Sequence, residues 1–244
     1  MPIVALSGLH GGTGATTVTA GLAWALHQAG ESVLAIDLSV DNLLRLHFNM
    51  PWEQARGWAR AELDGEVWVQ GAMAYDDRLA FLPFGRTTAG ERRQLRARDL
   101  LGAGHWRRQA ERLAAGGRYR WILLDAPWEN SDGGGLAAAG DYRLVVVRPD
   151  ANCHVRLHQQ PLPAGCQILI NDYSPLSRLQ QDIHQLWSLT LTGLAPVVIH
   201  RDEAVAEALA AKQPLGAYRP ESAAAAEFAT LAGWCLIHYA DDAP

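Results

Sequence analysis

Residues 10–17 carry the clearest chemistry in the chain, because they read HGGTGATT and place three glycines beside hydroxyl side chains. An apolar run at residues 3–6 precedes them and an apolar-periodic segment at 18–29 follows, which predicts a strand, a loop and a helix. Glycines bring backbone N–H groups against phosphate oxygens, and a helix N-terminus adds partial positive charge. We therefore predict a phosphate-binding loop formed by His10, Gly11, Gly12, Thr13, Gly14, Ala15, Thr16 and Thr17.

Two aspartates are candidate metal ligands near this loop. Asp37 follows the apolar run 33–36, and Asp125 follows the run 121–124. Thr16 stands where phosphate-binding loops place a hydroxyl on Mg²⁺. Aspartates at strand ends also form turns or helix caps, and a threonine is an ordinary residue for the first turn of a helix. Because both acids share a rim with a glycine loop, we predict Mg²⁺ at Thr16, Asp37 and Asp125.

Short apolar runs alternate with helical patterns along the chain, and continuous apolar runs are typical of buried parallel strands. The sequence predicts an α/β fold with a doubly wound, mostly parallel sheet, helices on both faces and a single domain over residues 1–244. Such sheets bind ligands at the carboxyl ends of their strands. Polar residues end several of the runs and should converge there: Asp37, Asp125, Asn171 and His200. The remaining runs lie at 79–82, 144–147, 167–170 and 196–199.

Composition narrows the function classes. The chain has 21 basic and 26 acidic residues, a net charge of −5 and a single lysine, Lys212, which disfavours general binding to nucleic acids or anionic membranes. The arginine-dense segment 91–120 is either a solvated helix face or a contact patch, and the Trp-rich segment 52–68 is either core or a partner site. The three cysteines lack metal-ligand spacing, which indicates reduced thiols, and no run is long enough to span a bilayer. We predict a cytoplasmic protein without a nucleic-acid partner and without direct membrane insertion.

The order of these motifs resembles the MinD/ParA/Mrp ATPases, whose deviant Walker-A loop is written KGGxGKTT. Residues 10–17 match that loop, Asp37 matches the first switch, and residues 123–127, LLDAP, match Walker B. The resemblance implies a homodimer that binds ATP and Mg²⁺ between its subunits. It also implies that Asn171 contacts the adenine amino group and that Arg219 and Pro220 pack near the base. An asparagine after a buried strand is also a common turn residue.

Several longer segments are similar to the BcsQ family, ATPase-like accessory proteins of bacterial cellulose secretion. This resemblance implies a cytoplasmic dimer that is recruited to the inner membrane through other cellulose-secretion components: a small companion subunit, a regulatory subunit and the inner-membrane synthase. Its function would be to assemble or position the synthase complex. The segments that carry it are 41–46, 57–61, 82–85, 150–160 and 169–172.

The chain differs from the superfamily pattern at positions on which ATP hydrolysis depends. His10 replaces the signature lysine, Ala15 replaces the ordinary loop lysine, and Ser39 replaces the acid that positions the attacking water. We expect ATP binding with little or no hydrolysis, as in a pseudo-ATPase. A protonated His10 would partly replace the cross-dimer lysine; the alternative is that it only fills a loop position. Two other functions stay open, a slow ATPase that drives a localisation cycle and a ParA-like DNA-binding partitioning factor that uses segment 91–120.

Overall fold

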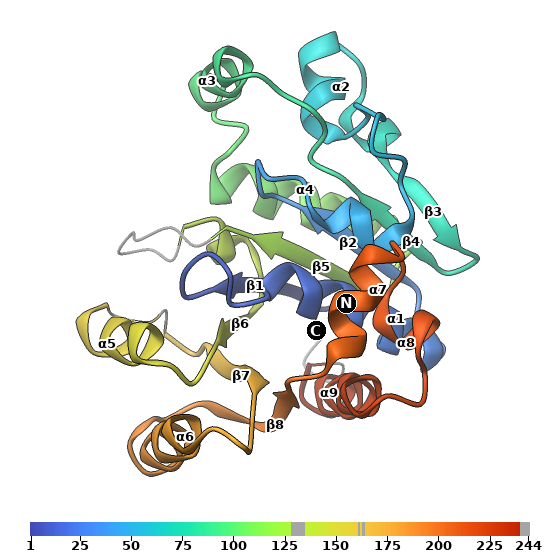
Figure 1. The fold of residues 1–244 in the computed structure, drawn as a ribbon. Coiled ribbons are helices and arrows are strands. Elements are labelled where there is room, and N and C mark those ends of the chain that lie inside the picture. The colour runs from blue at the N-terminus through green and yellow to red at the C-terminus, as the bar shows by residue number, and fades with distance from the viewer. Residues whose placement is uncertain (128–134, 161, 163, 240–244) are drawn as a thin grey trace.

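A single eight-stranded sheet forms the centre of the computed structural model, which describes residues 1–127, 135–160, 162 and 164–239 (Figure 1). The strand order is β3-β4-β2-β5-β1-β6-β7-β8, and every neighbouring pair is parallel except β3 and β4. The predicted doubly wound, mostly parallel sheet is confirmed. The strands are β1 (Ile3–Gly8), β2 (Val33–Asp37), β3 (Met73–Asp76), β4 (Leu79–Leu82), β5 (Trp121–Ala126), β6 (Tyr142–Val147), β7 (Gln167–Tyr173) and β8 (Leu194–His200).

The apolar runs became strands because both faces of the sheet are covered. All residues of β1, β2, β4 and β5 are buried, so these strands read as continuous rather than alternating apolar runs. The strand β3 was not predicted from the sequence. That strand is short, alternates between half-buried and exposed residues, and adds antiparallel to β4 at the sheet edge with a register shift between Ala74 and Asp76.

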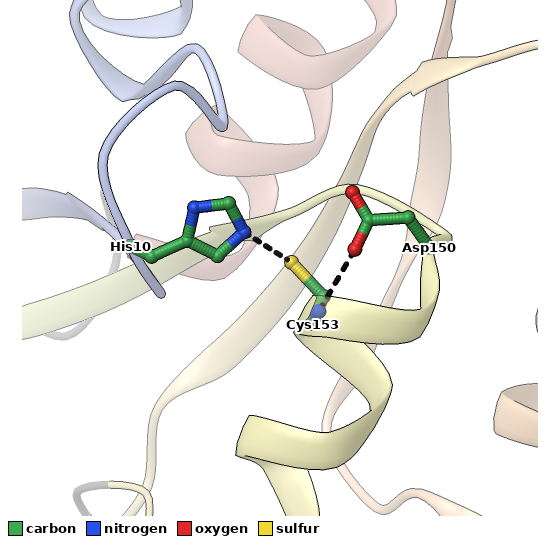
Figure 2. A group of neighbouring side chains, drawn as sticks. All are labelled: His10, Asp150 and Cys153. Atoms are coloured by element: carbon green, nitrogen blue, oxygen red, sulfur yellow. Dashed lines mark hydrogen bonds between the residues drawn. The ribbon is translucent and has the colours of Figure 1, made fainter.

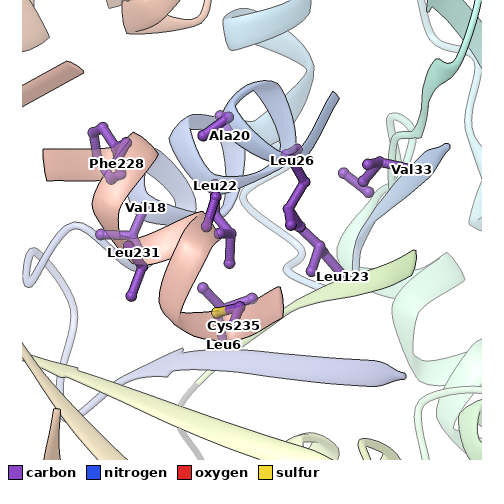
Figure 3. Close-up of a cluster of buried hydrophobic side chains, with 14 of the residues drawn as sticks. Leu6, Val18, Ala20, Leu22, Leu26, Val33, Leu123, Phe228, Leu231 and Cys235 are labelled. Carbon is purple, nitrogen blue, oxygen red and sulfur yellow. The ribbon is translucent and has the colours of Figure 1, made fainter. Parts of the chain in front are cut away.

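Helices cover the two faces in two groups. One face carries α1 (Ala15–Gln28), α7 (Glu203–Ala210), α8 (Leu215–Tyr218) and α9 (Ala223–Tyr239). Figure 3 shows the core of this face, where α1 and α9 interleave above β1 through Leu6, Val18, Leu22, Phe228 and Leu231. The short helix η1 (Leu44–Phe48) also packs on that first face. The other face carries α2 (Trp58–Asp64), α3 (Ala89–Ala97), α4 (Ala103–Ala115), α5 (Ala151–Gln159) and α6 (Arg178–Thr190), together with the short helices η2 (Trp68–Gly71) and η3 (Gly135–Ala139).

The two unusual segments of the sequence lie beside this second face. Trp58 is 1% exposed and packs edge to face on Trp106 with ring centroids 4.7 Å apart, whereas Trp52 is 56% exposed. The Trp-rich segment is therefore core at Trp58 and surface at Trp52. In the arginine-dense segment, Arg98 pairs with Glu62 at 2.9 Å and Arg107 pairs with Glu111 at 2.7 Å, as expected of a solvated helix face.

Among the residues that the structure describes, none of the helices has the length and apolar character needed to cross a bilayer.

The close approach of α1 and α9 depends on Gly21. A Cβ atom at this position would lie 2.8 Å from ring carbons of Phe228, a buried and rigid side chain. We expect Gly21→Ala to lower the free energy of unfolding by about 1–3 kcal/mol through overpacking. Gly233→Ala is the matched control, because Gly233 also lies in a helix but meets nothing within 4 Å, so alanine there should raise stability by up to about 1 kcal/mol. Urea unfolding measures both, and equal effects would contradict the packing assignment.

Candidate nucleotide-binding site

The glycine loop joins β1 to α1 in the conformation that a phosphate cradle requires. Gly12 and Gly14 have φ angles of 88° and 91°, in the left-handed region that a Cβ atom disfavours. Gly14 is the N-cap residue of α1 and supplies no capping side chain, and the first helical turn contains no acid. The first-turn N–H groups and the positive end of the helix dipole therefore stay available to an anion.

Neighbouring side chains hold the loop in place. Thr13 Oγ1 donates to the His10 carbonyl oxygen at 3.3 Å, and Asn171 Nδ2 donates to the Thr13 carbonyl oxygen at 2.8 Å. A Cβ atom on Gly14 would lie 2.4 Å from Asn171 Nδ2, so only glycine at this position leaves room for the hydrogen bond from Asn171 to Thr13. The structure thus gives Asn171 a contact with the loop that its sequence position did not predict, and its contact with adenine stays a prediction.

Thr16, Asp37 and Asp125 come together at the carboxyl rim. Asp37 and Asp125 are register partners in β2 and β5 and are 0% and 2% exposed. Asp125 accepts a hydrogen bond from the Thr16 side chain, and its Oδ2 is buried without a partner among the described residues. Asp37 accepts from two backbone amides of the following loop, Ser39 N at 2.9 Å on Oδ1 and Leu44 N at 3.1 Å on Oδ2.

Burial disfavours the charged form of both acids. It raises the pKa of Asp125 to about 7 against the Thr16 hydrogen bond, which lowers it. Burial also raises the pKa of Asp37 well above its usual range, and the neighbouring Asp125 charge adds to this shift. A divalent cation would relieve this desolvated pair, and a hydroxyl with carboxylate oxygens is the donor set that Mg²⁺ prefers. The unpaired Asp125 Oδ2 shows that these residues fit Mg²⁺.

A cavity of about 260 Å³ opens beside the loop. The phosphate loop contributes Gly12, Thr13, Gly14 and Thr17, while the ends of β7 and β8 and the start of α7 supply the other walls, including Asn171 and His200. Arg219 and Pro220, predicted near the base, are not among its lining residues. Arg219 Nη2 pairs with Glu207 Oε2 at 2.9 Å, on the helix α7 that forms one wall.

Two of the three substituted positions, His10 and Ser39, make side-chain contacts. His10 Nδ1 lies 2.6 Å from the Gly11 carbonyl oxygen, and its Nε2 lies 3.4 Å from Cys153 Sγ at the start of α5. Ser39 Oγ accepts from Asp41 N at 3.3 Å. The Cys153 contact could not be predicted from local sequence patterns, because it joins residues 143 positions apart. The reach of His10 across a dimer stays a prediction.

A glycine loop between the first strand and first helix, next to a strand that ends in aspartate, defines the P-loop fold of the MinD/ParA type. Solved structures agree. Cell division ATPase MinD from Pyrococcus furiosus superposes with a TM-score of 0.70 at 25% identity, covering 95% of this chain and 97% of that one. Septum site-determining protein MinD from Pyrococcus horikoshii, solved with Mg-ADP, superposes with a TM-score of 0.72 at 23% identity, covering 99% and 98%.

The sequence comparisons define the family more narrowly. The family model described as "Cellulose biosynthesis protein BcsQ" matches residues 1–236. The protein of that name from Salmonella typhimurium is 51% identical over 244 residues, which cover 99% of this chain and 97% of the relative. The chain belongs to the BcsQ family of cellulose biosynthesis proteins, as the sequence motifs predicted.

The buried acids predict a pH-dependent stability. Because folding raises the pKa of Asp125 to about 7, its stabilising contribution is present at pH 4 and is lost as pH rises through 7. Without Mg²⁺ or nucleotide, we expect the excess of Asp125→Asn over the wild type in free energy of unfolding to be small at pH 4 and to grow as pH rises through 7, because the unfolded carboxyl has its usual pKa of 3.8. At pH 8 the variant should exceed the wild type by on the order of 2–4 kcal/mol.

Denaturant unfolding at pH 4 to 8 in EDTA measures this difference. The buried His47, whose pKa burial lowers to about 4, titrates in the opposite sense but is common to both proteins and cancels. Asp182→Asn, at an exposed position of α6, is the control and should differ from the wild type by the same amount at every pH. A pH-independent difference for Asp125→Asn would refute the assignment.

Proposed function

We propose that this chain is an ATP- and Mg²⁺-binding accessory protein of bacterial cellulose biosynthesis and secretion. It acts as a nucleotide-dependent homodimer that assembles or positions the synthase complex, with little or no ATP hydrolysis. The observation that carries the proposal is the unpaired, buried Asp125 Oδ2 beside Thr16 and the left-handed glycine loop. Burying a carboxylate oxygen that has no hydrogen-bond partner costs folding free energy unless a bound ligand supplies the missing contact.

The site residues divide into three roles in this proposal. The loop residues 10–17 bind the phosphates through backbone amides, and Thr16, Asp37 and Asp125 hold Mg²⁺. Asn171 contacts the base in the cavity between the loop and the ends of β7 and β8, which it lines. Arg219 and Pro220, which lie outside the cavity lining, pack near the base when the nucleotide is bound. Mg²⁺ supplies charge neutralisation between the phosphate oxygens and the two buried carboxylates when it is bound.

Weak hydrolysis follows from the substituted positions. Ala15 and His10 stand where lysines would contact phosphate, and a lost charge-assisted hydrogen bond costs about 1.5–3 kcal/mol. Backbone amides and the helix dipole remain, so binding survives this loss. Phosphoryl transfer depends on positioned charge around the transferred group, and Ser39 carries no charge to orient water. ATP is then a ligand that switches or stabilises the dimer.

The family name supports a place among cellulose-secretion components, because the relative from Salmonella typhimurium is itself called a cellulose biosynthesis protein. We propose contacts with a small companion subunit, a regulatory subunit and the inner-membrane synthase. The protein is then cytoplasmic and reaches the inner membrane through these partners, with no nucleic acid involved.

Gly14→Ala tests the proposal, because the new Cβ would meet Asn171 and strain the loop. We expect wild-type protein with ATP and Mg²⁺ to double its mass in light scattering, and Gly14→Ala to stay monomeric with ATP affinity at least about tenfold lower. Gly65→Ala is the control, since Gly65 has a similar φ of 77° but ends α2, away from the loop. It should dimerise like the wild type.

Two further measurements are made on the same variants: phosphate release from ATP by the purified proteins, and cellulose production in cells. We expect no sustained turnover in the dimeric samples; turnover that vanishes in Asp125→Ala would instead establish a slow ATPase. In a Salmonella strain without its own BcsQ, the wild type and Gly65→Ala should restore cellulose, and Gly14→Ala should not. A monomer that is insensitive to ATP would overturn the proposed dimer.

A further inference from the structure

A cluster of three chemically different side chains lies beside the phosphate loop (Figure 2). His10 comes from the loop after β1, and Asp150 and Cys153 come from the first turn of α5. His10 Nε2 lies 3.4 Å from Cys153 Sγ, and one ligand atom of each residue lies within 4.8 Å of the other two. An imidazole nitrogen, a thiol sulfur and a carboxylate oxygen therefore lie close together at one point beside the loop.

The His10 ring presents a lone pair to this point. Its Nδ1 lies 2.6 Å from the Gly11 carbonyl oxygen, which can only accept, so Nδ1 carries the proton and donates. The neutral ring then keeps its lone pair on Nε2, directed at Cys153. Histidine ligands of metals are commonly fixed in this way, by donating the other ring N–H to a carbonyl oxygen.

The environment of Cys153 also suits a metal-bound sulfur. Arg148 N donates to Cys153 Sγ at 3.4 Å, and the sulfur lies in the first turn of α5, at the positive end of the helix dipole. Burial nevertheless raises the pKa of the Cys153 thiol to about 11, so the bound metal itself would have to stabilise the thiolate. Asp150 is the N-cap of that helix and uses Oδ1 to accept from Cys153 N at 2.8 Å. Its second carboxylate oxygen is free of that cap bond, and Asp150 is only half-buried, so the carboxylate has room to turn.

We propose that His10 Nε2, Cys153 Sγ and a carboxylate oxygen of Asp150 bind one Zn²⁺ ion. Sulfur and imidazole ligands favour zinc over the oxygen-seeking Mg²⁺ and Ca²⁺. Tetrahedral Zn–N and Zn–S bonds place the two ligand atoms about 3.6 Å apart, close to the 3.4 Å between His10 Nε2 and Cys153 Sγ. Binding releases the thiol proton to solvent, and water takes the fourth position.

Zinc at this site would tie the phosphate loop to α5 within one chain. His10 holds the position from which the family lysine reaches across the dimer, and a zinc-bound ring stays on its own subunit. The three ligand side chains do not need a bound nucleotide, so zinc binding can be tested independently of the proposed function.

Zinc titration of the full-length, chelator-stripped protein against a chromophoric competitor tests the site. We expect one Zn²⁺ per chain and at least tenfold weaker binding in His10→Ala, Cys153→Ser and Asp150→Asn. Asparagine preserves the helix cap and serine the hydrogen bonds of the thiol, so these variants should fold, which circular dichroism checks. Cys166→Ser, at the half-buried thiol next to β7, is the matched control and should bind like the wild type.

Cobalt distinguishes this site from others. With Co²⁺ in place of zinc, we expect a sulfur-to-metal charge-transfer absorption that Cys153→Ser abolishes. The other group of three ligand-type side chains in the described residues, His27, Asp76 and Asp77, contains no sulfur. Binding that survives Cys153→Ser but is lost in His27→Ala would overturn the proposal, as would a wild-type protein that binds less than stoichiometric zinc.

Discussion

The constraint on which the structure depends is the burial of two carboxylates, Asp37 and Asp125, side by side at the carboxyl rim of the sheet. Parallel pairing of β2 and β5 makes them register partners, and helices on both faces remove them from water. The chain compensates part of the cost locally. Asp37 accepts two backbone amides from the loop that follows it, and Thr16 donates to Asp125. One oxygen of Asp125 keeps no partner among the described residues, so the remaining cost is what a cation would relieve.

The loop around these acids is held by contacts from distant parts of the chain. Asn171 at the end of β7 donates to Thr13, and Cys153 at the start of α5 meets His10. Trp58 lies in the core on the face of the sheet opposite α1 and α9, and its Nε1 donates to the Asp37 carbonyl oxygen at 2.8 Å. The same elements that bury the core therefore set the position of the glycine loop and of the segment that follows β2. This explains how a loop without lysines keeps the shape of a phosphate cradle, because its shape comes from glycine geometry and packing rather than from charge.

Much of this fold could be read from the sequence, because the fold is built from strands buried on both faces. The runs at β1, β2, β4, β5, β6, β7 and β8 are continuous and apolar, and Asp37 and Asp125 mark where two of them end. β3 was not predicted because half of its residues face solvent at the sheet edge, so the strand has no continuous apolar run. The His10–Cys153 contact and the Asn171 brace were not predictable either. Each joins residues well over a hundred positions apart, and local patterning carries no information about which side chains the topology brings together.

The identity of the nucleotide that stays on the protein distinguishes ATP binding without hydrolysis from hydrolysis and from the absence of binding. The protein is incubated with ATP and Mg²⁺, passed through gel filtration and denatured, and the released nucleotide is separated by chromatography. We expect intact ATP on a dimer-sized species, because Asp125, Thr16 and the glycine loop bind ATP with Mg²⁺, while Ala15 and Ser39 lack the charges that hydrolysis needs. ADP on that species would contradict the hydrolysis-poor assignment, and the absence of any nucleotide would contradict the site itself.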